Sequence, residues 1–342
     1  MLIKSHMKIQ KSVFLIISLL SCSVLFSQIQ DPSSIYRKER DKINNLVHTK
    51  LKVNFNFEKK ELNGEEWLTL EPHFYSTNKV VLDAKAMIIQ TVSLDDKNLD
   101  YTYDGYQLTI ELPKEYKKGE TYTLYIKYTA RPEKVKDKGS IAITAAKGLY
   151  FINSTGSDPN KPTQIWTQGE TEANSCWFPT IDSPNQKTSQ EIYITVPNKF
   201  KTLSNGILVS QENSGSNRTD YWKFDQKHAP YLFFMGVGEY EVIEDSYKNI
   251  PVNYYVEKKY ASVAKDIFGL TPEMIGFFED RLGVAYPWAK YSQIVAREYV
   301  SGAMENTTAV VHGDDAYQMK GQLIDENSQE NTIAHEIFHH WF

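Results

Sequence analysis

Hydrophobic and polar residues alternate along the first two thirds of the chain. Leu51, Val53, Phe55 and Phe57 are each separated by one polar residue, and this period of two is typical of a strand with one buried face. Short apolar runs that predict further strands follow at residues 80–82, 87–92, 107–112, 121–128, 191–196, 221–224 and 231–237. Many short strands in succession indicate an antiparallel sandwich or saddle, which we expect over residues 46–245.

Glycine-containing dipeptides between these runs predict turns. Asn63-Gly64 is a strong hairpin signal, because both residues tolerate the positive φ angles of a two-residue turn. Asp104-Gly105 and Lys118-Gly119 mark turns further along the chain. We therefore expect these three dipeptides to separate neighbouring strands.

The pattern changes near residue 254, where helical spacing replaces the alternation. Apolar residues recur at spacings of three and four over residues 271–282, which predicts a helix. Thr271 is a candidate N-cap, Pro272 fits the first turn, and Gly283 predicts the end of the helix. Further helices are expected at residues 262–269 and 330–342, and a further strand at residues 293–296.

The N-terminus has the pattern of an export signal. Lys4, Lys8 and Lys11 precede an apolar run over residues 13–26, which is short for a membrane-spanning helix. We predict a signal peptide over residues 1–27, cleaved at Ser27-Gln28, and hence a periplasmic or secreted protein. Two alternatives stay open: Cys22 carries a lipid that associates the protein with a membrane, or the apolar run is an uncleaved anchor.

Composition narrows the class of partner. The net charge of −5 gives no basic excess with which to neutralise a phosphate backbone, so we expect no nucleic-acid partner. Hydrophobic residues make up 41% of the chain, as in a soluble globular protein. If Cys22 is removed with the signal, Cys176 is left without a disulfide partner. We interpret Cys176 as a packed structural residue, with a reactive thiol as the alternative.

The segment HEIFH at residues 335–339 has the spacing of a metal-binding helix. Residues four apart lie on one helix face, so the imidazoles of His335 and His339 can converge on one Zn²⁺ ion. A carboxylate at Glu336 can then take the proton of a metal-bound water as this water attacks a peptide carbonyl. His340 points about 100° away from that face, and we expect it to support a ligand or to pack, and not to bind the metal itself. The alternative is a surface helix in which these residue types coincide by chance.

Two further segments accompany HEIFH. One is GAMEN at residues 302–306, and the other is TQGE at residues 167–170, followed by WFP at residues 177–179. Together the motifs resemble those of the gluzincin zinc aminopeptidases, the family of aminopeptidase N and the leukotriene hydrolases. GAMEN is the most specific of them, because thermolysin-type endopeptidases share the HExxH pattern without it. The resemblance runs from about residue 47 to the end of the chain.

The resemblance implies a fold and an activity. The fold is a β-rich N-terminal saddle domain over residues 46–245, after a linker at 28–45, followed by the first part of an α+β thermolysin-like zinc peptidase domain at 246–342. The activity is hydrolysis of the N-terminal peptide bond of peptides, with one Zn²⁺ ion per complete site and Glu336 as the general base.

The resemblance also implies a binding site for the free N-terminus of the substrate. In the family the glutamate of GAMEN, here Glu305, binds the α-amine, and Glu170 assists from the β domain. Two carboxylates would attract an ammonium group and place the first peptide bond at the metal. The substrate-binding residues expected on this basis are Glu305, Glu170, Gly302, Ala303, Met304 and Gln168. The alternatives are a structural ion pair for Glu305 and a solvated loop position for Glu170.

The sequence departs from the family in two places. Many members have Arg where this chain has Ser175 or Cys176, and Cys where it has Thr180, which affects the expected shape of the pocket. Members also supply a third zinc ligand, a Glu, from a helix that would lie beyond Phe342. Because catalytic zinc normally has three protein ligands, we interpret the chain as the front portion of a longer, truncated aminopeptidase.

Two other functions stay open at this point. The chain could be a catalytically inactive fragment that binds peptide N-termini through Glu170 and Glu305. It could also belong to a bifunctional aminopeptidase and epoxide hydrolase, since the residues that separate these activities in the family lie beyond Phe342.

Overall fold

The structure is a computed structural model that describes residues 41–342. The predicted signal peptide, Cys22 and most of the predicted linker lie outside the described residues. Among residues 41–342, the helices are too short or too polar for any of them to cross a membrane. Residues 41–342 are joined into one unit by their mutual contacts.

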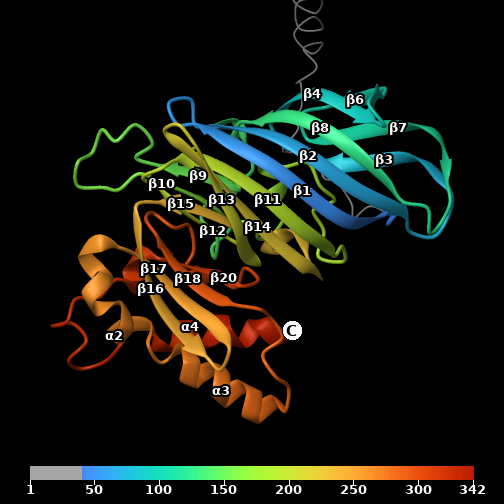
Figure 1. Ribbon diagram of the computed structural model, residues 1–342. Helices are drawn as coiled ribbons and strands as arrows, with labels where there is room; N and C mark the ends of the chain where they lie inside the picture. Colours follow the sequence, from blue (N-terminus) through green and yellow to red (C-terminus); the bar gives the residue numbers. More distant parts are fainter. Residues whose placement is uncertain (1–40) are drawn as a thin grey trace, which may run out of the picture. The chain divides into compact units, whose positions relative to one another are not determined.

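An eight-stranded sheet dominates the first domain, in the strand order β13-β14-β11-β1-β2-β8-β4-β5 (Figure 1). Its strands are β1 (Asn44–Asn56), β2 (Glu61–Pro72), β4 (Met87–Leu94), β5 (Lys97–Asn98), β8 (Tyr122–Ala130), β11 (Thr188–Pro197), β13 (Ile207–Ser214) and β14 (Asn217–His228). The alternation predicted from residue 51 onwards is that of β1. The pairs are antiparallel except for β1 with β11, which is parallel and places His48 opposite Ser189.

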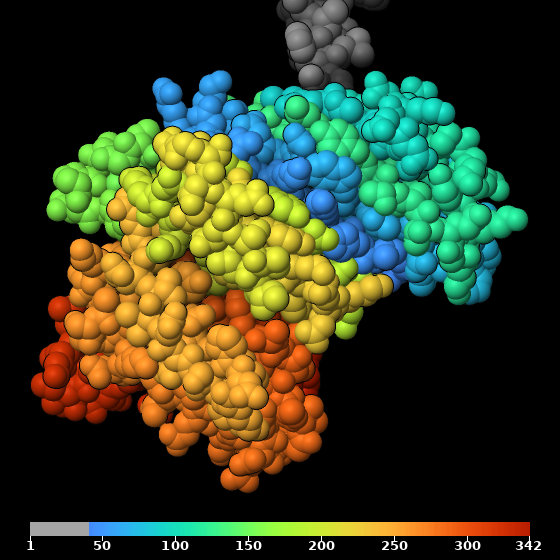
Figure 2. Space-filling model, viewed as in Figure 1, coloured from blue at the N-terminus to red at the C-terminus, as the bar shows by residue number. Residues whose placement is uncertain are grey.

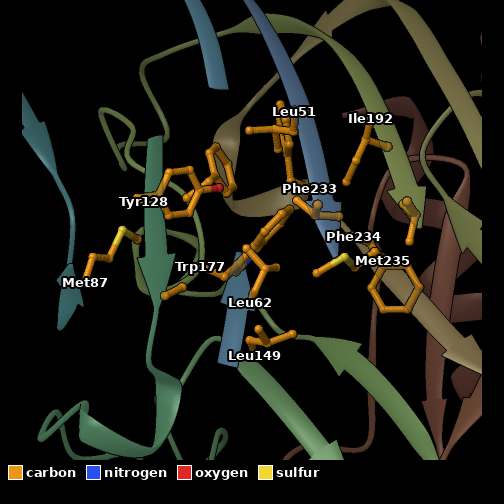
Figure 3. Packing of buried hydrophobic residues seen from close by; sticks show 14 of the residues in the cluster. Leu51, Leu62, Met87, Tyr128, Leu149, Trp177, Ile192, Phe233, Phe234 and Met235 are labelled. Atoms are coloured by element: carbon orange, nitrogen blue, oxygen red, sulfur yellow. The ribbon is translucent and has the colours of Figure 1, made fainter. Parts of the chain in front are cut away.

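Two smaller sheets complete the first domain. One has the order β3-β7-β6 and the other β12-β15-β10-β9. Their strands are β3 (Thr77–Asp83), β6 (Tyr101–Tyr103), β7 (Gln107–Tyr116), β9 (Leu149–Ile152), β10 (Gln164–Thr167), β12 (Lys201–Ser204) and β15 (Met235–Gly238). Figure 3 shows Leu51 and Ile192 of the large sheet, Leu149 of β9, and Phe233 and Trp177 between them, all of which belong to one apolar cluster. The β-rich saddle domain predicted from the alternation is therefore confirmed.

The hairpin predicted at Asn63-Gly64 is wrong, because both residues lie inside β2. The turn between β1 and β2 comes earlier, at residues 57–60. Gly64 is needed for packing: a Cβ built on it would lie 2.2 Å from the ring of Tyr128 on β8. The turns predicted at Asp104-Gly105 and Lys118-Gly119 are confirmed between β6 and β7 and between β7 and β8.

A five-stranded sheet with the order β16-β17-β18-β20-β19 forms the second domain. Its strands are β16 (Tyr240–Tyr247), β17 (Ile250–Glu257), β18 (Tyr291–Ala296), β19 (Ala303–Met304) and β20 (Ala309–Gly313). The sheet thus begins a few residues before the predicted boundary between residues 245 and 246, which stays a prediction. Figure 2 shows the residues after about 240, in orange and red, as one continuous mass.

Three helices accompany this sheet: α2 (Ala264–Phe268), α3 (Thr271–Leu282) and α4 (Glu330–Phe338). Figure 1 shows α3 and α4 lying together against the sheet, where Ile275, Ile333 and Ile337 join one apolar cluster with strand residues. The combination of helices with a mixed sheet confirms the predicted start of an α+β domain after the saddle.

The ends of the helices correct some details of the prediction. Gly283 ends α3 with φ of 67°, as predicted, and Pro272 lies in its first turn. Thr271 does not cap α3, because its hydroxyl donates to the Phe268 carbonyl and accepts from Gln293. The last helix ends at Phe338, and the chain continues as a short 3₁₀ turn (His339–Trp341).

Candidate active site

The two histidines of HEIFH point toward each other from the exposed side of α4. Ile333 and Ile337 are buried on the opposite side of the helix, and this apolar contact fixes which face is exposed. The Nε2 atoms of His335 and His339 lie 3.1 Å apart, and their ring planes are inclined at 78°. The predicted convergence of the two imidazoles is therefore present in the structure.

The imidazole pair fits two positions of a zinc site. Two ligands of one tetrahedral zinc ion lie about 3.4 Å apart, close to the observed separation of the Nε2 atoms. Within residues 41–342 no cluster of three His, Cys, Asp or Glu side chains suited to hold a metal ion is found. The described residues thus offer two imidazole nitrogens for the predicted zinc ion, and both the metal and a third ligand beyond Phe342 stay predictions.

Glu336 lies on the buried side of the same turn. Glu336 is only 5% exposed, and its Oε2 atom has no hydrogen-bond partner among the described residues. Burial raises the pKa of Glu336 to about 8, with further contributions from the charges of Glu305 and Glu170. An unpaired buried carboxylate is costly in a purely structural role and is suited to proton transfer.

Glu305 is brought to the site by β19, the edge strand of the five-stranded sheet. Strand β19 pairs only with β20 among the described strands, with Met304 opposite Val311, and Glu305 follows it directly. The Gly302 carbonyl accepts a hydrogen bond from Gly313 N at 2.9 Å. Gly302 is exposed, and nothing lies within 4 Å of the position of a Cβ. There is therefore free space beside Gly302, and pairing of Gly302 and Ala303 with a substrate backbone stays a prediction.

Glu170 reaches the same place from the first domain. It follows β10, and its residue is exposed. The pKa of Glu170 is raised, first by partial desolvation and then by the charge of Glu305, while His339 lowers it. The carboxylates of Glu170, Glu305 and Glu336 thus lie within electrostatic reach of one another, and that of Glu170 also lies within reach of His339.

Gln168 is buried, whereas a side chain that binds substrate has to be accessible. Its residue is 1% exposed, and its Nε2 atom donates to the Met304 sulfur at 3.5 Å. The Tyr299 hydroxyl donates to its Oε1 atom. Both ends of the amide, and the buried side chain of Met304, are therefore engaged inside the protein. A role of Gln168 and Met304 in binding substrate stays a prediction.

Two tyrosines at the site were missed by the sequence interpretation. Tyr231 forms a hydrogen bond with Glu305, and its pKa is raised by burial and then by the charges of Glu305 and Glu170. Tyr299 lies close enough to Glu336, Glu305 and Glu170 for their charges to add to the effect of burial in raising its pKa. The strand predicted over residues 231–237 is wrong at its start, because Pro230–Leu232 form a short 3₁₀ turn and β15 begins at Met235. The Ala229-Pro230 step is the one sign of this turn in the sequence.

His340 and Cys176 are packing residues, as expected. His340 is buried, and its Nδ1 atom lies 2.9 Å from the Tyr286 hydroxyl, away from the histidine pair. Burial lowers the pKa of His340 to about 3. Cys176 is a free thiol with no exposed surface, and burial raises its pKa to about 12, so its thiolate is not available at neutral pH.

Comparison with known proteins assigns both parts of the chain. The family model described as "Peptidase M1 N-terminal domain" matches residues 45–232, and that described as "Peptidase family M1 domain" matches residues 267–342. Probable aminopeptidase 2 of Sulfurisphaera tokodaii is 24% identical over 85% of this chain and 34% of its own length. Glutamyl aminopeptidase of Bos taurus is 30% identical over 48% of this chain and 18% of its own length.

A third relative is the Tricorn protease-interacting factor F2 of Thermoplasma volcanium, which is 29% identical over 57% of this chain and 24% of its own length. The chain therefore spans about a third or less of the length of these curated relatives. The match to the N-terminal domain model covers more than half of the chain, and the match to the peptidase domain model includes the HEIFH segment. The chain belongs to peptidase family M1, of which it matches the N-terminal domain and the first part of the peptidase domain.

Proposed function

We propose that the chain carries the general base, two zinc ligands and the amine-binding acids of a zinc-dependent aminopeptidase. The observation that carries this proposal is the gathering of Glu170, Glu305 and Glu336 beside His335 and His339. Three carboxylates at close range repel one another unless a cation lies among them. Such a site favours ligands with a positive charge, namely a metal ion and a substrate ammonium group.

Glu170 and Glu305 suit the recognition of a free N-terminus. A peptide whose ammonium group lies between these two carboxylates has its first peptide bond held near the histidine pair. An internal peptide bond has no ammonium group to hold in this way. The arrangement therefore favours removal of the first residue over cleavage within a chain, in agreement with the names of the relatives.

Glu336 suits the role of general base. A zinc ion held at His335 and His339 would lower the pKa of a bound water so that it is deprotonated near neutral pH. The unpartnered Oε2 atom of Glu336 can receive that proton and later donate it to the leaving amine. Because Glu305 and Glu170 contribute to the raised pKa of Glu336, a substrate ammonium group beside them lowers this pKa toward the ionised form that a base requires.

The activity is tested with the complete gene product. We expect zinc-dependent release of the N-terminal residue from aminoacyl reporters, and no cleavage of N-acetylated reporters. The Glu336→Gln variant should lose activity by about 10²–10⁴-fold, the usual contribution of a general base. The matched control is Glu330→Gln, an exposed glutamate on the same helix. Equal activity of the Glu336→Gln variant, or equal cleavage of acetylated reporters, would contradict the proposal.

A binding module for peptide N-termini is the second candidate, because Glu170 and Glu305 meet within residues 41–342, whereas only two zinc ligands are found there. It predicts that the complete gene product binds peptides with a free N-terminus but does not hydrolyse them with any added divalent metal. Hydrolysis that depends on Glu336 excludes this candidate.

A further inference from the structure

A short turn, η4 (Pro230–Leu232), lies next to the segment that carries Glu170. Asn174, four residues after Glu170, is fully buried and donates from Nδ2 to the Pro230 carbonyl at 2.7 Å and to the Phe233 carbonyl at 3.0 Å. The two backbones also touch directly. A Cβ on Gly169 would lie 2.1 Å from the Tyr231 carbonyl oxygen. The position of the turn relative to Glu170 is therefore fixed by hydrogen bonds and by close contact.

The same turn is tied to the segment that carries Glu305. Asn205 is fully buried, and its Nδ2 atom donates to the Leu232 carbonyl at 2.9 Å and to the Thr307 carbonyl at 2.7 Å. Its Oδ1 atom accepts from Phe234 N at 2.8 Å. Since Thr307 comes two residues after Glu305, one side chain holds the turn and the Glu305 segment together.

Tyr231 is the middle residue of this turn, and its half-buried side chain hydrogen-bonds Glu305. An ammonium group has three N–H donors, and Glu170 and Glu305 account for two acceptors. A phenol oxygen that donates its hydrogen to a carboxylate still has lone pairs with which to accept. The amide of Gln168 is engaged with Tyr299 and Met304 instead.

We propose that Tyr231 is the third acceptor for the α-ammonium group of the substrate, beside Glu170 and Glu305. The inference rests on the proposed recognition of a free N-terminus. Asn174 and Asn205 hold the Tyr231 turn against both acid-bearing segments, so the backbones that carry the three side chains are fixed relative to one another. The hydroxyl of Tyr231 then contributes to the preference for a free amine and not to the binding of the rest of the substrate.

The test compares two ligands on the complete gene product, freed of metal so that neither ligand is hydrolysed, by calorimetry: leucinamide, and 4-methylpentanamide, which lacks only the amine. The ratio of their dissociation constants measures the preference for the amine. We expect Tyr231→Phe to reduce this preference about 10-fold, the loss of one hydrogen bond to a charged group. The control is Tyr240→Phe, which removes a buried hydrogen bond to the Val295 carbonyl in the five-stranded sheet. It should leave the ratio of the two dissociation constants unchanged.

The outcomes separate this inference from the proposed function. If the wild-type chain shows no preference for leucinamide, recognition of a free N-terminus fails. If the wild type prefers leucinamide and Tyr231→Phe keeps the full preference, or weakens both ligands equally, the role of Tyr231 is overturned. Should Tyr231→Phe not fold, as judged by its melting transition, Tyr231→Leu is measured in the same way, and an unchanged ratio there has the same consequence.

Discussion

The imidazole of His228 joins strand β14 to the segment that carries Glu305. Its Nδ1 atom lies 3.1 Å from the Thr307 hydroxyl, and its Nε2 atom lies 3.1 Å from Oε1 of Gln190 on β11. The residue is buried, and both ring nitrogens are engaged. The first domain thus supports the segment that carries Glu305 through a neutral, fully hydrogen-bonded histidine.

Acid should destabilise the chain through this contact. Burial lowers the pKa of His228 to about 3, whereas an unfolded histidine titrates near 6.5. The unfolded state therefore binds the proton first, and the free energy of unfolding falls as the pH drops from about 6.5 toward 3. We expect urea titrations at several pH values in this window to show a steeper loss for the wild type than for His228→Gln. Parallel curves would contradict this assignment.

Gly64→Ala should destabilise the first domain. The added Cβ would lie 2.2 Å from the Tyr128 ring, and both residues belong to paired, buried strands. Overpacking of this kind typically costs about 1–3 kcal/mol of unfolding free energy. Gly321→Ala is the control, because no atom lies within 4 Å of the new Cβ there. Chemical denaturation of both variants measures the difference, and equal stability would show that the Tyr128 ring moves aside freely.

Replacement of Glu66 should stabilise the chain. Glu66 has no exposed surface, neither of its carboxyl oxygens has a hydrogen-bond partner among the described residues, and burial raises its pKa well above the usual value. Removing an unsatisfied buried polar group recovers about 1–3 kcal/mol. Glu66→Met should therefore raise the denaturation midpoint, whereas Glu65→Met on the other face of β2 should not. A lower midpoint for Glu66→Met would mean that the carboxyl group has a function in the core.

Zinc binding by the chain should be weak and should depend on both histidines. The described residues provide His335 and His339, whereas catalytic zinc sites normally use three protein ligands. We expect metal analysis of the 342-residue chain to show loss of zinc on dialysis, and His339→Ala to abolish the weak binding seen by titration. Retention of one zinc ion per chain would show that another residue completes the site.

Local patterns in the sequence predicted much of the fold correctly. Alternation predicted β1, helical spacing predicted α3, and Gly283 marked its end, because each of these depends on residues within one or two turns of one another. The spacing of HEIFH likewise placed His335 and His339 together, since His339 follows the last residue of α4 directly and keeps a helical backbone conformation. These features are properties of a single segment, and the sequence determines them directly.

Tertiary structure decided the features that join distant segments. Gly64 belongs to a strand, where it pairs with Tyr128 of β8, and not to the turn that its neighbours in the sequence predict. The parallel pairing of β1 with β11 likewise brings His48 opposite Ser189. The same holds for the site, where Tyr231 meets Glu305. Local propensity is a small energy that packing between segments overrides, and no short window of sequence contains the residue on the other side of the contact.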